Sequence, residues 1–319
     1  MSIEQTKIWL QRWGRRLWAL PRLRKLDLKR IPKRKPEEVW LFLVCRNEAL
    51  RLPAMLDYHF QLGVSRAIVV DNGSTDDTLP YLLSQSRVHV FETKQSFAGN
   101  KLAWQELMLR RFGQGYWNLV LDADELFVYP NMQRDSLPSY VQALEQEGAQ
   151  ALHAIFLEMF SREPISEVRY HAHQDLLAAA PYFDGDGYCK KKYRPVFDQM
   201  GSAFVYMGGA RARVFGGEFG CSKIPLLKYA AHQFLRLGFH TIEGARLSSH
   251  QGAVLHFKYL QDFHEKVRRE AQRQVYWNGA SEYKAYAALL EQNPHFTLWH
   301  PAAIRFESWQ TLAQAGLIN

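Results

Sequence analysis

Apolar and polar residues follow one another in blocks that predict strands separated by short helices from Val39 onward. Four apolar runs have the length of strands and lie at 39–45, 66–71, 88–93 and within 117–127. Three segments with helical spacing separate them, at 49–62, 76–83 and 98–112. This alternation is typical of parallel βαβ units, in which ligands bind at the carboxyl ends of the strands.

The second half of the chain has a less regular pattern. Residues 151–160 predict another strand of the same sheet, and residues 161–200 predict long loops. Helices are expected from about residue 260, at 260–277, 281–291 and 302–315. We therefore expect an α/β fold of a mostly parallel sheet flanked by helices, with a helical C-terminal region. The expected units are an arm and linker at 1–36, a catalytic domain at 37–259 and a C-terminal region at 260–319.

Composition supports a folded protein without a membrane-spanning helix. The 319 residues are 47% hydrophobic, which is enough to build a large core. No run of 18 uncharged apolar residues occurs, so no transmembrane helix is expected. The three scattered cysteines do not indicate a disulfide framework or a zinc site. With no secretory signal, they favour the cytoplasm.

The net charge of +8 comes from the N-terminus. Residues 1–36 hold twelve Lys or Arg and two acidic residues, whereas the rest of the chain holds 28 basic and 30 acidic residues. Trp9, Trp13 and Leu17 recur at helical spacing among these basic residues, which is typical of a helix lying on an anionic membrane surface. The alternative is a helix that packs on the body. Because the body has no second basic patch, nucleic acid is not an expected partner. From Pro21 to Pro36 we expect an extended linker.

The strongest chemical signal is the pair Asp122 and Asp124, which ends the run LVLDADE. In an extended backbone these two carboxylates point the same way. Two like charges at the end of a buried strand need a counter-charge, and a divalent cation such as Mn²⁺ or Mg²⁺ would supply it. Because Asp-x-Asp is a common pattern, its interpretation depends on the rest of the sequence.

Two further acidic residues end or follow predicted strands. Asp71 stands before the turn NGST, where a carboxylate can accept hydrogen bonds from a base or a ribose, and Glu48 holds the matching place after the first strand. The alternative is that the segment is only a well-formed helix start. The sequence has neither a G-x-G-x-x-G motif nor a Walker lysine motif, which argues against a dinucleotide dehydrogenase and a P-loop NTPase.

Residues 39–129 resemble family 2 glycosyltransferases with the glycosyltransferase-A fold. The matching segments are CRNEALRLPAMLDYHFQLGV, AIVVDNGSTDDT and YWNLVLDADELF. GGARARVF, SKIPLLKY and VLHFKYLQDF continue the likeness, so it extends over residues 39–315. The Arg-Asn-Glu opening, Tyr58-His59 and the Asp-Ala-Asp-Glu run resemble the branch of these enzymes found in bacterial polysaccharide and lipopolysaccharide gene sets.

The resemblance implies a nucleotide-diphosphate sugar donor, with a UDP-sugar expected first. It implies that Arg46, Glu48 and Asp71 bind the donor, and that Asp122 and Asp124 hold a metal and the diphosphate. His256 matches a late histidine that completes the metal site. The alternative for His256 is a buried core histidine. Lys258 would share its face in an extended chain and could contact a phosphate.

The catalytic base has no clear signal. The candidates are Asp184, Asp186 and Glu218, each beside a glycine that allows close approach of a substrate. Each of them could equally be part of an ordinary turn. Arg211 and Arg213 would share a face if 210–215 is a strand, and they could hold the diphosphate or an anionic acceptor.

Two classes of function are consistent with these residues. The first is a metal-dependent glycosyltransferase that acts on a hydroxyl of a glycan or lipid-linked acceptor, with inversion, in cell-surface polysaccharide synthesis. Such an enzyme could sit peripherally on the inner face of the cytoplasmic membrane. The second is a nucleotide-sugar-binding or polyanion-binding protein without transferase activity. A nucleotidyltransferase would normally show a glycine-rich basic loop after the first strand, where this chain has RNEALRLP.

Overall fold

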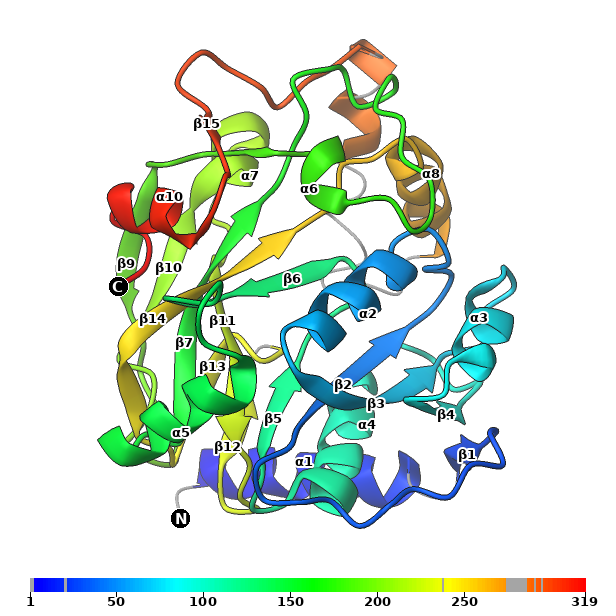
Figure 1. Cartoon of the computed structure of the whole chain (residues 1–319), viewed down its shortest axis with the longest axis vertical. Helices are drawn as coiled ribbons and strands as arrows, with labels where there is room; N and C mark the ends of the chain where they lie inside the picture. Colours follow the sequence, from blue (N-terminus) through cyan, green and yellow to red (C-terminus); the bar gives the residue numbers. More distant parts are fainter. Residues whose placement is uncertain (1–2, 20–21, 237, 274–285, 290, 294) are drawn as a thin grey trace.

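A large central sheet organises the computed structural model, which describes residues 3–19, 22–236, 238–273, 286–289, 291–293 and 295–319 (Figure 1). Within these residues the sheet has nine strands in the order β1-β4-β3-β2-β5-β11-β7-β14-β6. They span Arg24–Lys25 (β1), Val39–Cys45 (β2), Val64–Asp71 (β3), Val88–Glu92 (β4), Trp117–Val120 (β5), Glu125–Val128 (β6), Ala151–Glu158 (β7), Ser222–Lys228 (β11) and Leu247–His256 (β14).

Most of these strands run in one direction. β4, β3, β2 and β5 are parallel neighbours. β11 is antiparallel to both β5 and β7, and β14 is parallel to β7. Six strands therefore share one direction, whereas β1, β11 and β6 oppose it. The carboxyl ends of the six strands meet at one edge of the sheet, and this geometry positions the site.

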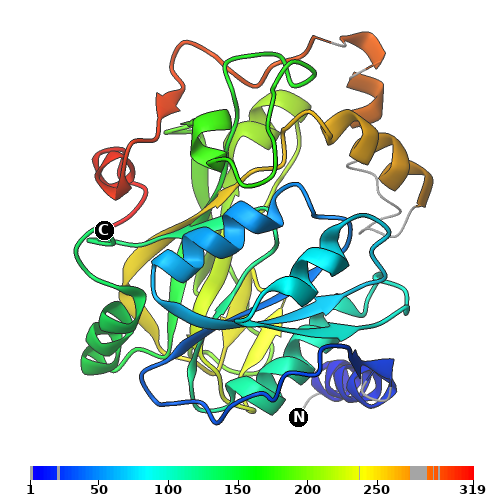
Figure 2. The same ribbon diagram turned by 45° about the vertical axis from the view of Figure 1, so that its right-hand side comes forward.

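Helices cover both faces of the sheet (Figures 1 and 2). Leu41 and Leu43 of β2 belong to the core beneath α2 and α5, whereas Trp40 and Phe42 belong to the core beneath α4. This alternation follows from the two-residue period of a strand, and burial on both faces explains the continuous apolar run. The helices on these faces are α2 (Leu52–Gln61), α3 (Thr78–Ser84), α4 (Lys101–Met108, followed by a π-helical turn at Leu109–Gly113) and α5 (Leu137–Glu147).

Further helices and short strands surround the central sheet. The remaining helices are α1 (Ile3–Ala19), α6 (Leu176–Ala179), α7 (Gly209–Phe215), α8 (Phe263–Arg273) and α10 (Trp309–Gln314). The short strands outside the central sheet are β8 (Tyr182–Phe183), β9 (Tyr188–Lys192), β10 (Phe204–Gly208), β12 (Phe234–Arg236), β13 (Thr241–Glu243) and β15 (Ile304–Arg305). None of the described helices is long and apolar enough to cross a membrane.

The α/β class with a mostly parallel sheet between helices is confirmed, and one local expectation is wrong. The helix expected at 302–315 is a strand, β15, followed by the shorter α10, because Ile304 and Arg305 pair with β8. The segment expected to be an extended linker packs on the body. β1 pairs with β4, and the buried Arg34 donates a 2.7 Å hydrogen bond to Asn118.

Part of the helical C-terminal region cannot be compared with the structure. Of the helices expected at 260–277 and 281–291, the parts at 274–285 and 290 lie outside the described residues. The division into units at 1–36, 37–259 and 260–319 stays a prediction.

Candidate active site

The carboxyl ends of β2, β5 and β14 border a cavity of about 160 Å³, here called the carboxylate cavity. Among the residues that the structure describes, the cavity is lined by Val44, Cys45, Glu48, Phe97, Lys101, Asp122, Ala123, Asp124, His256, Lys258 and Lys266. Five of the residues that the sequence singled out therefore lie together here: Glu48, Asp122, Asp124, His256 and Lys258. They come from segments more than 200 residues apart, and the shared strand direction brings them together.

Asp122 is paired with lysines. The ammonium nitrogen of Lys101 lies 2.6 Å from Oδ1 and 2.7 Å from Oδ2 of Asp122, so it faces both carboxylate oxygens. The ammonium group of Lys223 lies 3.7 Å from Asp122 Oδ2. Burial opposes the charge on Asp122, but Lys101 and Lys223 outweigh it and lower the pKa of this carboxyl to about 2. Asp122 is therefore ionised at neutral pH.

Asp124 lies at one end of a chain of buried charges. His256 Nε2 lies 3.3 Å from Asp124 Oδ2, and His256 Nδ1 lies 2.8 Å from Glu158 Oε2. Arg211 Nε lies 2.6 Å from the other oxygen of Glu158. Burial disfavours a charged His256, but Glu158 and Asp124 outweigh it and raise the pKa of His256 to about 9. The imidazole is thus held between two carboxylates, and it is not an ordinary core histidine.

The sheet register explains this arrangement. His256 ends β14 and lies directly beside Glu158, the last residue of the parallel strand β7. On its other side His256 pairs with Glu125, the first residue of β6. Glu125 is buried and accepts a 2.8 Å hydrogen bond from the Asp122 backbone N–H as well as contacts from the ammonium group of Lys223. Glu125 and Lys223 therefore fix the turn that carries both aspartates.

Glu48 lines the cavity beside two cationic side chains. Its Oε1 is 2.8 Å from Lys266 Nζ, and its Oε2 is 3.7 Å from Arg51. Lys266 Nζ is also 3.9 Å from Asp124. The buried Arg51 makes a double ion pair with Asp262, which joins the start of α2 to the segment that follows His256. Lys258, also in the lining, lies 3.3 Å from the Tyr286 hydroxyl.

Asp71 and Arg46 stabilise the loops beside the cavity. Asp71 is fully buried and accepts hydrogen bonds from the Ser74 backbone N–H, at 3.0 Å, and from the Ser74 hydroxyl. It thereby closes the NGST turn. Arg46 donates a 3.2 Å hydrogen bond to the Asn72 carbonyl. Neither residue is part of the described cavity lining, so their donor-binding roles stay predictions.

The three base candidates also lie outside that lining. Asp184 is buried, and it accepts hydrogen bonds from Arg213 at 2.9 Å and pairs with His300 at 3.0 Å. Asp186 is exposed in the turn before β9, and Glu218 is exposed and paired with Lys191 at 2.7 Å. The identity of the base stays a prediction.

Residues 210–215 are not a strand but belong to helix α7, so the condition for a shared face of Arg211 and Arg213 is not met. Gly208 and Gly209 adopt φ values of 117° and 70°, a backbone conformation that ends β10 and starts the helix. Arg211 and Arg213 consequently point to different partners, Glu158 and Asp184. The two arginine side chains therefore do not lie on one face.

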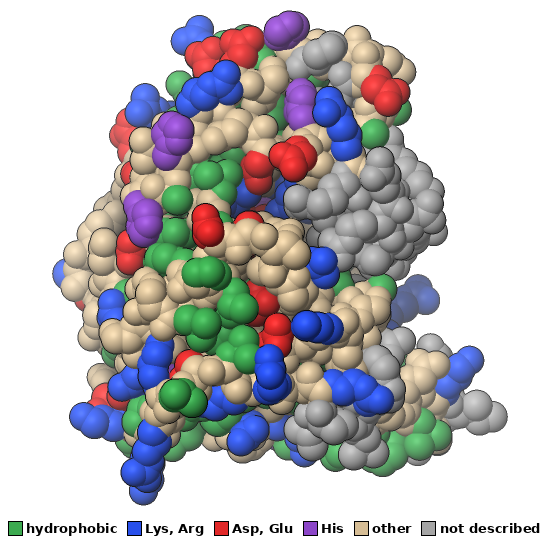
Figure 3. Space-filling view, turned by 90° about the vertical axis from the view of Figure 1, so that its right-hand side faces the viewer, with side chains coloured by type: hydrophobic (Ala, Val, Ile, Leu, Met, Phe, Trp, Pro, Cys, Tyr) green, Lys and Arg blue, Asp and Glu red, His purple; other side chains and the backbone are tan. Residues whose placement is uncertain are grey.

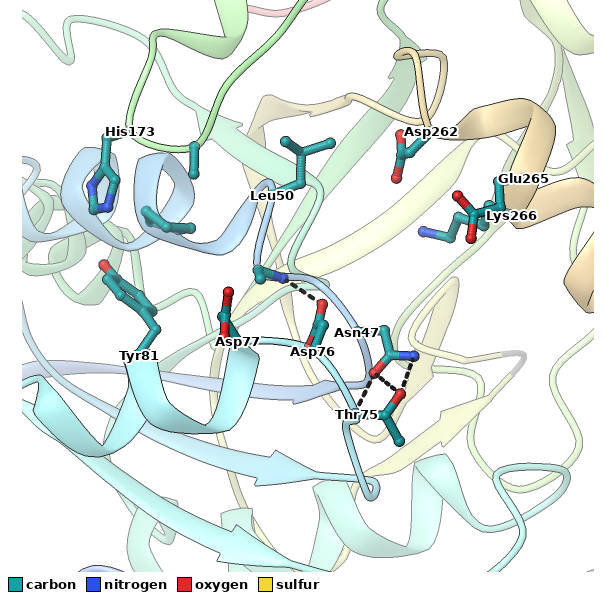
Figure 4. A pocket seen from close by; sticks show the side chains of 13 residues that line it. Asn47, Leu50, Thr75, Asp76, Asp77, Tyr81, His173, Asp262, Glu265 and Lys266 are labelled. Carbon is teal, nitrogen blue, oxygen red and sulfur yellow. Dashed lines mark hydrogen bonds between the residues drawn. The ribbon is translucent and has the colours of Figure 1, made fainter.

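A second and larger pocket of about 630 Å³ adjoins the carboxylate cavity, and Lys266 lines both. We call it the acidic pocket, because Asp76, Asp77, Asp262 and Glu265 line it. Figure 4 shows Asp262 and Lys266 facing the loop of Asn47, with Asp76 and Asp77 at the start of α3 below. The rest of the described lining consists of Ala49, Leu50, Pro53, Thr75, Tyr81, Ala172, His173 and Glu265. Figure 3 shows acidic and basic side chains around a hollow on this side of the molecule. The volume of the acidic pocket, about 630 Å³, is in the range of small-molecule binding sites.

Four important residues were not singled out from the sequence: Lys101, Glu158, Lys223 and Lys266. For Glu158 and Lys223 a signal existed, because each is a charged residue in a strand whose pattern is mostly apolar. Lys101 and Lys266 lie on helices whose sequences look ordinary, so their importance depends on tertiary packing.

The side chains facing the cavity have the right chemistry for a hard divalent cation. Two carboxylates and an imidazole suit Mn²⁺ or Mg²⁺. In the described parts of the chain, however, no three His, Cys, Asp or Glu side chains are grouped so as to hold an ion. Asp122 and Asp124 are paired with Lys101 and His256 instead. The residue types therefore fit such an ion, but binding it requires that these ion pairs open.

Comparisons with known proteins give only distant structural likenesses. No protein-family model matches the chain, and no curated protein matches it. Glucosyl-3-phosphoglycerate synthase from Mycobacterium tuberculosis, solved with Mn²⁺, UDP and phosphoglyceric acid, is 20% identical with a TM-score of 0.26, over 41% of this chain and 46% of that one. This chain thus spans about half the length of that protein.

Two further solved structures cover more of the chain. The mannosyltransferase PcManGT from Pyrobaculum calidifontis, in complex with GDP-Man and Mn²⁺, is 15% identical with a TM-score of 0.36, over 96% of this chain and 80% of that one. A UDP-glucose pyrophosphorylase complexed with UDP-glucose is 10% identical with a TM-score of 0.29, over 87% and 96%. Likeness at this level does not assign a reaction to this chain.

Proposed function

We propose that this chain is a metal-dependent glycosyltransferase with a glycosyltransferase-A fold, which takes a sugar from a nucleotide-diphosphate donor. The observation that supports the proposal most is the convergence of Asp122, Asp124 and His256 on one cavity together with Lys258 and Lys266. Carboxylates and an imidazole can hold a divalent cation, and lysines can contact phosphate oxygens. A cavity that offers both groups suits a metal-bound diphosphate.

In this mechanism the chain positions the donor and stabilises the leaving group. Asp122 and Asp124 would hold the cation, and Glu158 would orient His256 toward it. When bound, the ion would neutralise the charge that develops on the departing diphosphate. Lys258 and Lys266 would add positive charge near the same oxygens. The adjoining acidic pocket, whose carboxylates can accept hydrogen bonds from hydroxyl groups, has room for the rest of a substrate.

The finer parts of the proposal rest on the resemblance to family 2 enzymes. They are a UDP-sugar donor, a glycan or lipid-linked acceptor, inversion at the anomeric carbon, and a role in cell-surface polysaccharide or lipopolysaccharide synthesis. The alternative is a nucleotide-sugar-binding or polyanion-binding protein without transferase activity. A nucleotidyltransferase is a third class.

Product analysis separates these classes. The purified chain is incubated with a panel of UDP- and GDP-sugars and Mn²⁺, with and without pyrophosphate. A glycosyltransferase releases nucleoside diphosphate and free or transferred sugar, and pyrophosphate is not consumed. Formation of nucleoside triphosphate and sugar phosphate from pyrophosphate would instead indicate a nucleotidyltransferase. Binding of the donor without formation of any product would indicate a nucleotide-sugar-binding protein without transferase activity.

We also propose that α1 attaches the protein to an anionic membrane surface. Trp9 and Leu10 of α1 are large apolar side chains that are 39% and 57% exposed. The helix packs on α4, and Arg110, directly after α4, lies 5.1 Å from the Trp13 ring. Figure 1 shows α1 at the lower end of the molecule, and Lys7, Arg12, Arg15 and Arg16 stand among its apolar residues in the sequence. Exposed apolar side chains among basic ones are typical of interfacial helices.

A further inference from the structure

Lys101 holds the position on Asp122 that a bound cation would need. It is the first residue of α4, its side chain is 27% exposed, and it lines the carboxylate cavity. Its ammonium nitrogen contacts both oxygens of Asp122, at 2.6 Å and 2.7 Å. This two-oxygen contact is also how a carboxylate binds a metal ion in bidentate fashion. Any cation that binds Asp122 in this way must compete with Lys101.

Lys223 contacts the same aspartate but differs in its surroundings. Its side chain is only 6% exposed, it lies 3.7 Å from Asp122, and its main partner is the buried Glu125. It is not part of the described cavity lining. Lys101 can therefore swing from the carboxylate into the cavity on its flexible stem, whereas Lys223 is held in place.

We propose that Lys101 binds the diphosphate of the donor and that its ion pair with Asp122 occupies it when no donor is bound. A divalent cation and Lys101 compete for Asp122, and the released ammonium group then pairs with a phosphate oxygen of the donor. A cation without a diphosphate must displace Lys101 from Asp122 and therefore binds weakly. When a diphosphate is present, the displaced ammonium group pairs with it, so the cation binds more tightly. Metal and donor binding are thereby coupled. This inference rests on the proposed function, since it needs a metal and a diphosphate at this cavity.

The coupling predicts effects of opposite sign for one substitution. Lys101→Met keeps a long side chain but removes the charge. It should tighten the binding of Mn²⁺ alone by about tenfold or more, because a competing ion pair is lost. It should weaken the binding of UDP or GDP at saturating Mn²⁺ by a similar factor. Mn²⁺ binding is measured by the electron paramagnetic resonance signal of the free ion, and nucleotide binding by calorimetry.

Lys228→Met is the matched control. Lys228 also forms an ammonium–carboxylate pair, at 2.8 Å from Glu145, but this pair is exposed and outside the cavity lining. It should change neither affinity. Circular dichroism confirms that both variants are folded, as expected for partly exposed side chains.

The outcomes separate this inference from the proposed function. If Lys101→Met leaves the Mn²⁺ affinity unchanged or weakens it, while Asp124→Asn abolishes Mn²⁺ binding, the competition is refuted and the proposed function stands. Tighter Mn²⁺ binding with unchanged nucleotide affinity would also overturn the inference, since Lys101 would then be only a counter-ion. If the wild-type chain binds no Mn²⁺ with or without nucleotide, both proposals fail.

Discussion

Asp122 and Asp124 are two residues apart, yet their surroundings differ. Asp122 faces the partly exposed ammonium group of Lys101, which belongs to a helix. Asp124 faces His256, which is fixed by Glu158 and, through it, by Arg211. All the partners on the Asp124 side have side chains at most 13% exposed. One side of the cavity can thus exchange partners, and the other is preorganised.

The difference follows from the elements that supply the partners. His256 and Glu158 end two neighbouring parallel strands, and the sheet register holds them side by side. Lys101 starts a short helix and reaches Asp122 only through its long side chain. The strand ends at His256 and Glu158 supply fixed geometry, and the helix-borne Lys101 supplies a charge that can move. Substitutions on the two sides should therefore have different consequences.

The largest effect is expected for Asp124→Asn. The change removes one charge but little volume, so the fold should survive. Mn²⁺-dependent donor binding should weaken, and sugar release should fall by roughly 10²-fold or more, because the charge that holds the cation is lost. Initial rates with the active donor measure the effect. A folded Asp124→Asn protein with normal rates would remove Asp124 from the mechanism.

Glu158→Gln should have the next largest effect. The amide keeps the shape of the side chain but weakens the hold on His256 Nδ1, so Mn²⁺ affinity should fall by about tenfold. NMR of the His256 ring nitrogens gives a readout that a general loss of stability would not produce, since loss of the Glu158 charge should lower the pKa of a ring that Glu158 and Asp124 hold protonated. Glu145→Gln, at an exposed ion pair with Lys228 outside the cavity lining, serves as control. Unchanged ring-nitrogen signals in Glu158→Gln would contradict a positioning role.

The charge on His256 predicts a pH dependence of stability. Burial lowers its pKa, but Glu158 and Asp124 outweigh that effect, and the folded value of about 9 exceeds the ordinary 6.5. A raised pKa stabilises the fold fully below pH 6.5, and this contribution is lost as the pH rises through about 9. It amounts to about 3 kcal/mol at most.

Urea unfolding from pH 6.5 to 9.5 measures this loss. The unfolding free energy of the wild type should decline with pH, and His256→Gln should show a flatter profile. Parallel profiles for the two proteins would mean that His256 is not held charged between the carboxylates.

The smallest effect on catalysis is expected for removal of residues 1–19. The truncation must stop there, because the buried Arg34 and strand β1 in the following segment belong to the fold. Turnover of a soluble donor should be nearly unchanged, whereas binding to phosphatidylglycerol vesicles should be lost. Vesicle binding of the intact chain should also weaken with salt. Equal vesicle sedimentation of both proteins would exclude α1 as the attachment site.

The sequence predicted the residues at strand ends best. The apolar runs before Cys45 and Asp71 and within 117–127 located the strands, and the shared strand direction then explains why Asp122, Asp124 and His256 meet. The face that Arg211 and Arg213 would share in a strand is absent, because two glycines with positive φ start a helix there. The composition of residues 22–36 gave no sign of strand β1 or of the buried Arg34.

The charged partners of the site could not be predicted from local pattern. Lys101 and Lys266 reach their carboxylates across 21 and 218 residues of sequence. Arg34, in the supposed linker, is buried only because Asn118 and the Trp117 carbonyl accept its hydrogen bonds. Such pairs depend on how distant elements pack. A single sequence shows neither which carboxylate a lysine will pair with nor how far apart the two side chains will lie.

The most direct test of the central claim is sugar release from the active nucleotide-sugar donor during removal and return of the metal. The account predicts that excess chelator stops release by the wild-type chain, that added Mn²⁺ restores it, and that Asp124→Asn stays inactive under both conditions. Full release in excess chelator, with the chain folded, would contradict a metal-dependent transfer at Asp122 and Asp124.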